Sequence, residues 1–344
     1  MPLGRMSAYA SADLPGIGAP TRILAEDLRC EEVPRRPPSG DGAHWWVQVR
    51  KTDIATGQAR KAVARAAGIA EDLVACAGSR DRRGTCLQWF SVPAEAFEGP
   101  GPLRNVGYQN KLRSVKVVAD PKRVDEVGVT HLRWNLRLRG VGGSEAYQKA
   151  KPILDLLRRE GIPNFVPPAL FGREGELARW GRLLCQDQPL PGRLGRDVTP
   201  GRCLWAFQHW LFNRWVAERL RDGCFDRAVE GDVIATRSGE TTVVTDADHA
   251  SRRCASWEAV VQGPLFGEGC TPAAAEALAR EASILADLGL TADAIARLRG
   301  GRRALRFQPL KTTLEIEGQD LNLQADLPCE AHLQVLIDEL CKPS

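Results

Sequence analysis

The chain has 344 residues, 43% apolar and 26% charged, which is enough to bury the core of one large domain or two ordinary ones. It contains no run of eighteen apolar residues, and its first residues lack an apolar stretch behind a basic start. We therefore expect no membrane span and no secretory signal. The ten cysteines never have C-x-x-C spacing and only five histidines are present, so we expect free thiols in a reducing cytoplasm and no metal.

The net charge is only +4, but basic residues concentrate in three stretches, 111–123, 131–140 and 300–311. Most of them are arginines, whose guanidinium grips phosphate through two parallel hydrogen bonds and stacks on bases. Any one stretch is most simply a solvated face of a strand or loop. Three of them, beside an arginine-rich loop at 80–83, favour a nucleic-acid partner, RNA or DNA.

The first part of the chain alternates strand and helix signals. Period-two patterns predict strands at 21–33, 44–51, 85–92, 113–119 and 132–140. Between the second and third strands we predict one helix, capped by Thr56 and closed by Gly68. These elements indicate an α+β unit with mixed or antiparallel strands.

The middle of the chain changes character. Helices are predicted at 144–161, 203–223 and 271–289, β-structure returns only at 305–328, and a last helix follows at 330–341. We therefore expect an α+β protein with a sheet domain in two halves, 1–154 and 301–344. A mostly helical inserted domain, 155–300, would lie between these halves.

One loop contains the strongest candidate for chemistry. It reads AGSRDRRGTCLQWF over 77–90, and its carboxylate, Asp81, is flanked by Arg80, Arg82 and Arg83. Cationic neighbours should keep Asp81 ionised, as nucleophilic attack or proton abstraction requires. Taken by itself, the stretch is better explained as a surface ion pair, which stabilises by about 0–1 kcal/mol.

Motifs for other chemistry are missing. No glycine-rich segment has the strand-to-helix setting and the Lys-Ser/Thr pair of a nucleotide-binding fold. His209 and His249 have no second ligand at metal-binding spacing. An ordinary metabolic enzyme on an α+β fold would need such a motif, so this third hypothesis is the weakest.

Several stretches in a fixed order resemble the TruD family of tRNA pseudouridine synthases. The early family motif L-K-x-x-x-x-D-F-x-V-x-E corresponds to TRILAEDLRCEEV, and the motif around the family's nucleophile, A-G-x-K-D-x-x-x-x-T-x-Q-W-F, corresponds to AGSRDRRGTCLQWF. GIPNF, LFNRWVAERL, VEGD, GPLFG and GRRALRFQP then follow in the family's order. The resemblance runs from about residue 14 to the C-terminus and fits the alternation of sheet, helical insertion and sheet.

The resemblance implies a pseudouridine-synthase-like fold and isomerisation of a tRNA uridine to pseudouridine, without a cofactor or a metal. It places Asp81 at the catalytic position, and the family's target is a D-arm uridine at position thirteen. A cytoplasmic monomer with tRNA as its partner is implied as well. The substrate-binding positions that the motifs imply are Arg22, Arg80, Gln88, Trp134, Asn164 and Arg302.

Several positions depart from the family motifs, and four of these bear on whether catalysis is retained. Leu28 replaces a Phe, Cys86 a Thr, Leu132 an Asn and Leu170 an Arg. Two hypotheses follow: an active synthase with a rebuilt pocket, or an RNA-binding relative with lost or weakened catalysis. Retention of Asp81 among cationic neighbours favours the active synthase.

Overall fold

The computed structural model describes residues 8–18, 24–96, 98–190, 195 and 198–343. The chain divides into two units, each assembled from separate stretches of sequence. We call them the sheet unit (Ala19–Lys151 and Pro309–Glu330) and the helical unit (Met1–Gly18, Pro152–Gln308 and Ala331–Ser344). Both combine strands with helices, so the predicted α+β class is confirmed.

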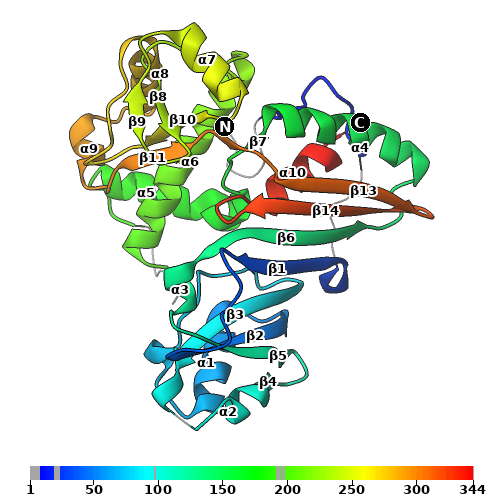
Figure 1. Ribbon diagram of the computed structural model, residues 1–344. Helices are drawn as coiled ribbons and strands as arrows, with labels where there is room; N and C mark the ends of the chain where they lie inside the picture. Colours follow the sequence, from blue (N-terminus) through cyan, green and yellow to red (C-terminus); the bar gives the residue numbers. More distant parts are fainter. Residues whose placement is uncertain (1–7, 19–23, 97, 191–194, 196–197, 344) are drawn as a thin grey trace. The chain divides into compact units, whose positions relative to one another are not determined.

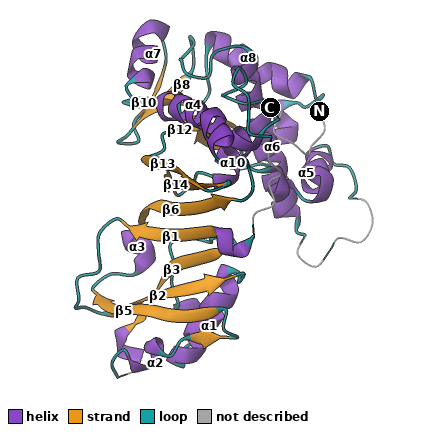
Figure 2. Cartoon of the chain, turned by 90° about the vertical axis from the view of Figure 1, so that its right-hand side faces the viewer, coloured by secondary structure: helices purple, strands orange, loops and turns teal. Residues whose placement is uncertain are grey.

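One eight-stranded sheet forms the sheet unit, in the order β13-β14-β6-β1-β3-β2-β5-β4 (Figure 1). Among these described strands β1 and β3 run parallel and the other neighbours antiparallel, so the sheet is mixed. Figure 2 shows β14, β6, β1, β3, β2 and β5 following one another across it. The strands are β1 (Leu28–Pro34), β2 (His44–Thr52), β3 (Thr85–Pro93), β4 (Gly107–Tyr108), β5 (Leu112–Asp120), β6 (Val129–Leu138), β13 (Lys311–Glu317) and β14 (Asp320–Pro328).

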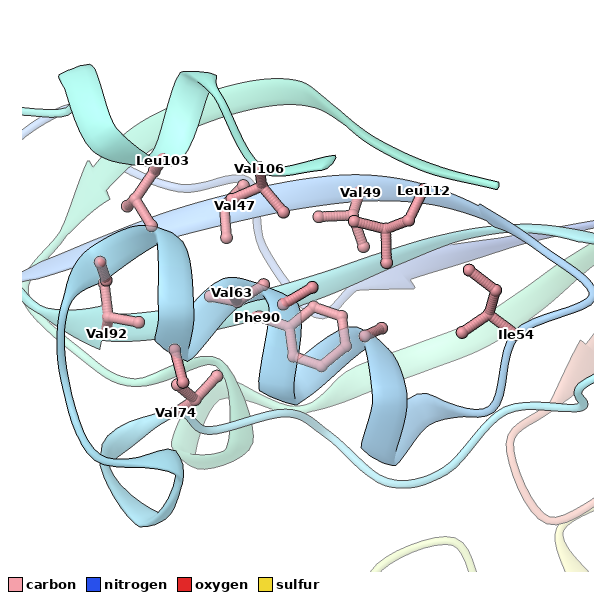
Figure 3. Close-up of a cluster of buried hydrophobic side chains, with 14 residues drawn as sticks. Val47, Val49, Ile54, Val63, Val74, Phe90, Val92, Leu103, Val106 and Leu112 are labelled. Carbon is pink, nitrogen blue, oxygen red and sulfur yellow. The ribbon is translucent and has the colours of Figure 1, made fainter. Parts of the chain in front are cut away.

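Helix α1 (Thr56–Ala67) packs its apolar stripe on one face of this sheet (Figure 3). Val63 of the helix belongs to the same buried cluster as Val49 and Phe90 of the strands. Gly68 ends the helix in the left-handed conformation (φ +68°), as predicted, but the N-cap is Ala55 and not Thr56. Two short helices complete this unit, α2 (Gly101–Arg104) and α3 (Val124–Val127).

The helical unit surrounds one long helix, α6 (Pro200–Arg221), which buries Trp215 almost completely. The other elements are α5 (Glu176–Cys185), α7 (Ala247–Ala255), α8 (Ala275–Ala286), α9 (Ala292–Ala296), α10 (Leu333–Cys341), β7 (Ile162–Pro163), β8 (Val233–Thr236), β9 (Thr241–Val243), β10 (Ala259–Leu265), β11 (Gly301–Ala304) and β12 (Arg306–Phe307). Helix α4 (Ser144–Glu160) contains the boundary at which the chain passes from Lys151 of the sheet unit to Pro152 of the helical unit. None of the described helices is long and apolar enough to cross a membrane.

The helical unit also contains an antiparallel sheet, in the order β11-β10-β8-β9. The prediction that β-structure returns only at 305 was therefore wrong. Strands such as β10, AVVQGPL, are short apolar runs without alternation, and periodicity cannot separate such runs from buried helix.

Both chain ends group with the helical unit, whereas the sequence analysis placed them in the sheet domain. The reason lies in contacts between the two ends themselves. The carboxylate of Glu339 on α10 accepts hydrogen bonds from the backbone of Ala10 and from Ser11, and Lys342 donates to the Ser11 hydroxyl at 2.5 Å. These bonds join segments more than 300 residues apart in sequence, so local patterns could not predict them.

Candidate active site

Asp81 lies in a loop, residues 77–84, that leads into β3 of the sheet unit. Its side chain is exposed, and its carboxylate forms no hydrogen bond or ion pair with the residues that the structure describes. Among the described residues, Asp81 therefore does not form the surface ion pair that the sequence suggested. The carboxylate stays available to a ligand, and the exposed Arg82 and Arg83 beside it supply positive charge that attracts phosphate.

Thr56 and Gln88 hold the backbone of this loop. The Thr56 hydroxyl accepts a hydrogen bond from the Arg80 backbone N–H at 2.9 Å and lies 3.1 Å from Gln88 Oε1. The Gln88 amide donates to the Gly78 carbonyl at 3.0 Å. Gln88 is completely buried, so in this structure its amide binds the loop and has no access to a ligand.

Lys51 fixes the backbone of Asp81 itself. Its Nζ donates to the Asp81 carbonyl at 2.7 Å and to the Ile54 carbonyl at 3.1 Å. Lys51 is 1% exposed, and burial lowers the pKa of its ammonium group. The loop ends at Gly84, where φ is +88° and a Cβ would lie 2.7 Å from the Leu28 carbonyl oxygen, so another residue would strain the turn.

Arg80 is paired with Glu32 of β1, with 2.7 Å between its Nε and the Glu32 Oε1. Its two terminal nitrogens donate to the carbonyls of Ser79 and Ala77, while Glu32 Oε2 accepts from the Trp89 N–H at 2.8 Å. Burial raises the pKa of Glu32 to about 7, although Arg80 opposes that shift. The guanidinium of Arg80 therefore holds the loop against the sheet and does not pair with Asp81.

A row of buried side chains crosses the same face of the sheet beside the loop. In register, Cys86 of β3 lies opposite Cys30 of β1, and Cys30 opposite Trp134 of β6. Two strand spacings, roughly 10 Å, thus separate Trp134 from Cys86. Trp134 is buried, and its Nε1 has no hydrogen-bond partner among the described residues. Leu132, two residues before Trp134, is buried on that face too.

The remaining predicted site residues are not among the described residues of the sheet unit. Arg22 lies outside the described residues. Asn164 and Arg302 belong to the helical unit. The Asn164 side chain binds the Ala304 carbonyl at 2.9 Å and Arg303 at 2.6 Å. Within the sheet unit the structure thus places Asp81 and Arg80 in one loop and Gln88 on the strand that supports this loop. Trp134 lies on β6, two strands away from β3.

Arg302 is buried in an ion pair with Glu281 of α8, at 2.5 Å, and also donates to the Thr271 carbonyl. We predict that Arg302→Met lowers the free energy of unfolding by about 3–5 kcal/mol, because it leaves a buried carboxylate without its partner. Urea denaturation measures this loss, and the double variant Arg302→Met/Glu281→Met should recover much of it. Unchanged stability together with weaker tRNA binding would instead support Arg302 as a substrate-binding residue.

Three supporting residues were not selected from the sequence. Glu32 is the last residue of the early family motif, which offered a signal for it. Lys51 continues the inward face of β2 after Val47 and Val49, and a lysine at such a position needs a buried partner. The sequence around Thr56 predicts only a helix cap, whereas in the structure its hydroxyl accepts a hydrogen bond from the Asp81 loop.

Comparison with known proteins agrees with this architecture. The family model described as tRNA pseudouridine synthase D (TruD) matches residues 5–187 and 204–330. A tRNA pseudouridine synthase D from Anaeromyxobacter dehalogenans strain 2CP-1 is 33% identical over 342 residues, covering 97% of this chain and 96% of the relative. One from Thermus thermophilus is 29% identical and covers 97% of this chain and 92% of its own.

A solved structure from Methanosarcina mazei, assigned to TruD, has the same fold. Its TM-score to this chain is 0.77 at 17% identity, covering 99% of this chain and 97% of that one. Together with the family model and the relatives, the ordered motifs around Asp81 establish membership: the chain belongs to the tRNA pseudouridine synthase D (TruD) family.

Proposed function

We propose that the protein isomerises a uridine of tRNA to pseudouridine and that Asp81 is its catalytic carboxylate. The observation that carries this proposal is that the backbone of Asp81 is held in place while its carboxylate is not. Lys51 holds the Asp81 carbonyl at 2.7 Å, whereas the Asp81 side chain is exposed and its carboxylate forms no hydrogen bond or ion pair with a described residue. A fixed backbone with a free carboxylate is what a nucleophile or base needs to reach one atom of a bound substrate.

The reaction is an isomerisation, so atoms balance within the nucleotide. The bond from C1′ of the ribose to N1 of uracil breaks, and a bond from C1′ to C5 forms. The C5 proton is lost, and N1 acquires a proton. Asp81 either attacks the ribose or removes a proton from it, which releases the base so that it can rotate. The uridine must leave its stack first, as in other enzymes that act on a base.

The exposed arginines beside Asp81 would draw the tRNA backbone to the loop, and this attraction should weaken with salt. We place the target uridine in the D-arm, at position thirteen. A tRNA substrate would place the enzyme in the cytoplasm. We also propose that it acts as a monomer. Buried Leu132 favours the second candidate function, an RNA-binding relative with weakened catalysis, because leucine lacks hydrogen-bonding groups.

Pseudouridine mapping on an unmodified tRNA transcript tests this function. We expect one new pseudouridine at position thirteen, and none in a matched transcript with cytidine there. Modification at another uridine would refute the position but keep the reaction. Binding of both transcripts without any product would support the RNA-binding relative.

A further inference from the structure

A small cavity of about 280 Å³ lies in the helical unit, away from the loop of Asp81 in sequence. This volume is close to the lower limit of roughly 300 Å³ for small-molecule pockets, so the cavity has room for a single small group. Helices α5 and α6 and the turn after α8 provide its lining: Ala178, Arg179, Arg182, Phe207, Trp210, Arg214 and Leu288.

The cavity has an aromatic wall. Trp210 is half-buried and lines the space, and the fully buried Phe207 packs nearly parallel to it, with 6.0 Å between ring centroids and an interplanar angle of 16°. One helical turn separates the two rings, so α6 and Phe207 together fix the orientation of the indole. A rigid indole is a platform on which any base can stack.

Three arginines line the same space, and they are neutralised to different degrees. Arg214 pairs with Glu218 and Asp287. Arg182 donates to the Leu288 carbonyl at 2.8 Å, and its Nε is buried without a hydrogen-bond partner among the described residues. Arg179 is exposed and forms no hydrogen bond or ion pair with any described residue. No carboxylate of the described residues pairs with Arg179 or Arg182, so within this part of the chain both cations keep their positive charge at the cavity.

We propose that this cavity binds one nucleotide of the RNA substrate, outside the uridine that reacts. Its base stacks on Trp210, and its phosphate lies between Arg179 and Arg182. An aromatic platform beside two arginines that have no carboxylate partner among the described residues matches unstacked RNA, in which the base offers a π-face and the backbone a negative charge. A purely apolar partner would add no negative charge to two cations that have no carboxylate partner in the described part of the chain. The identity of the RNA as tRNA rests on the proposed function; the recognition chemistry rests on the cavity.

Equilibrium binding of an unmodified tRNA transcript tests the phosphate contact, since binding needs no catalysis. Arg179→Ala is expected to weaken affinity roughly threefold and to reduce the slope of log K against log salt by roughly 0.7–0.9. Arg221→Ala is the matched control, because Arg221 is an exposed arginine at the end of α6 and outside the cavity. Equal effects of the two substitutions, or none from Arg179→Ala, would overturn the phosphate contact.

The stacking contact is tested with two substitutions at Trp210. Trp210→Phe keeps a ring and should bind nearly as well, whereas Trp210→Leu should lose roughly 5- to 150-fold in affinity, the cost of one base stack. Circular dichroism and thermal melting verify that both variants are folded. Wild-type affinity in a folded Trp210→Leu protein would overturn the proposal.

A third measurement separates RNA from a free nucleotide. Saturable binding of uridine 5′-monophosphate that Trp210→Leu abolishes, with tRNA affinity unchanged, would make the cavity a mononucleotide site and refute the RNA assignment. These binding measurements also distinguish a failure of this proposal from a failure of the proposed catalysis. An inactive protein with this cavity in use still shows weaker tRNA binding in Arg179→Ala and Trp210→Leu.

Discussion

Asp81→Ala is expected to abolish pseudouridine formation and to leave tRNA affinity within about twofold of wild type. The substitution removes the one carboxylate that the 77–84 loop presents without engaging it. Loss of a positioned acid or base costs about 10²–10⁴-fold in rate, and loss of a nucleophile costs at least as much. Single-turnover conversion of the tRNA transcript measures the rate, and filter binding measures the affinity.

Asp72→Ala is the matched control for this experiment. Asp72 is an exposed aspartate of the same unit, outside the loop, so its removal changes net charge equally and should leave the rate unchanged. Asp81→Asn should be as inactive as Asp81→Ala, since it keeps the shape of the side chain and removes its charge. Equal rates for wild type and Asp81→Ala would refute the catalytic role.

The second large effect concerns the ion pair behind the loop. Arg80→Met is expected to lower the free energy of unfolding by about 3–5 kcal/mol at pH 8, because it leaves the Glu32 carboxylate buried without its cation. Both side chains are almost fully buried, at 7% and 0% exposed, so water cannot replace the lost partner. Urea denaturation of wild type and variant measures the difference.

The size of that loss should depend on pH. Burial raises the pKa of Glu32 from its ordinary 4.5 to about 7. Between those values the folded protein holds more protons than the unfolded chain, so stability falls as pH rises. Without Arg80 the folded pKa rises further, and the variant continues to lose stability above pH 7, by at most about 1.4 kcal/mol per pH unit.

We therefore expect a larger difference between wild type and Arg80→Met at pH 8 than at pH 5.5. The double variant Arg80→Met/Glu32→Gln carries no ionisable group at this position and should remove the extra pH dependence. A difference of the same size at both pH values would show that Glu32 does not titrate in this way.

Part of the candidate site could be predicted because its information is local. The sequence 77–90 combines a turn, three arginines, one acid and a strand, and the structure keeps that order as a loop that enters β3. The roles of the supporting residues were not local. Arg80 was expected at the substrate, but its partner Glu32 lies 48 positions earlier, on a strand parallel to the one that follows the loop. Pairing of strands decides such contacts, and one strand's sequence does not specify its neighbour.

By itself, the sequence determined the α+β class, most strands and helices, the family resemblance and the identity of Asp81 as the candidate acid. Those features depend on periodicity and on short motifs, each complete within a few residues and read in their order along the chain. Only the tertiary structure decided that Gln88 and Arg80 support the loop, that Glu281 holds Arg302, and that the carboxylate of Asp81 stays free. A buried charge needs a partner of opposite charge, and the fold can supply that partner from a distant part of the sequence. Whether a charged side chain binds such a partner or remains available to a ligand is therefore decided by burial and by long-range pairing.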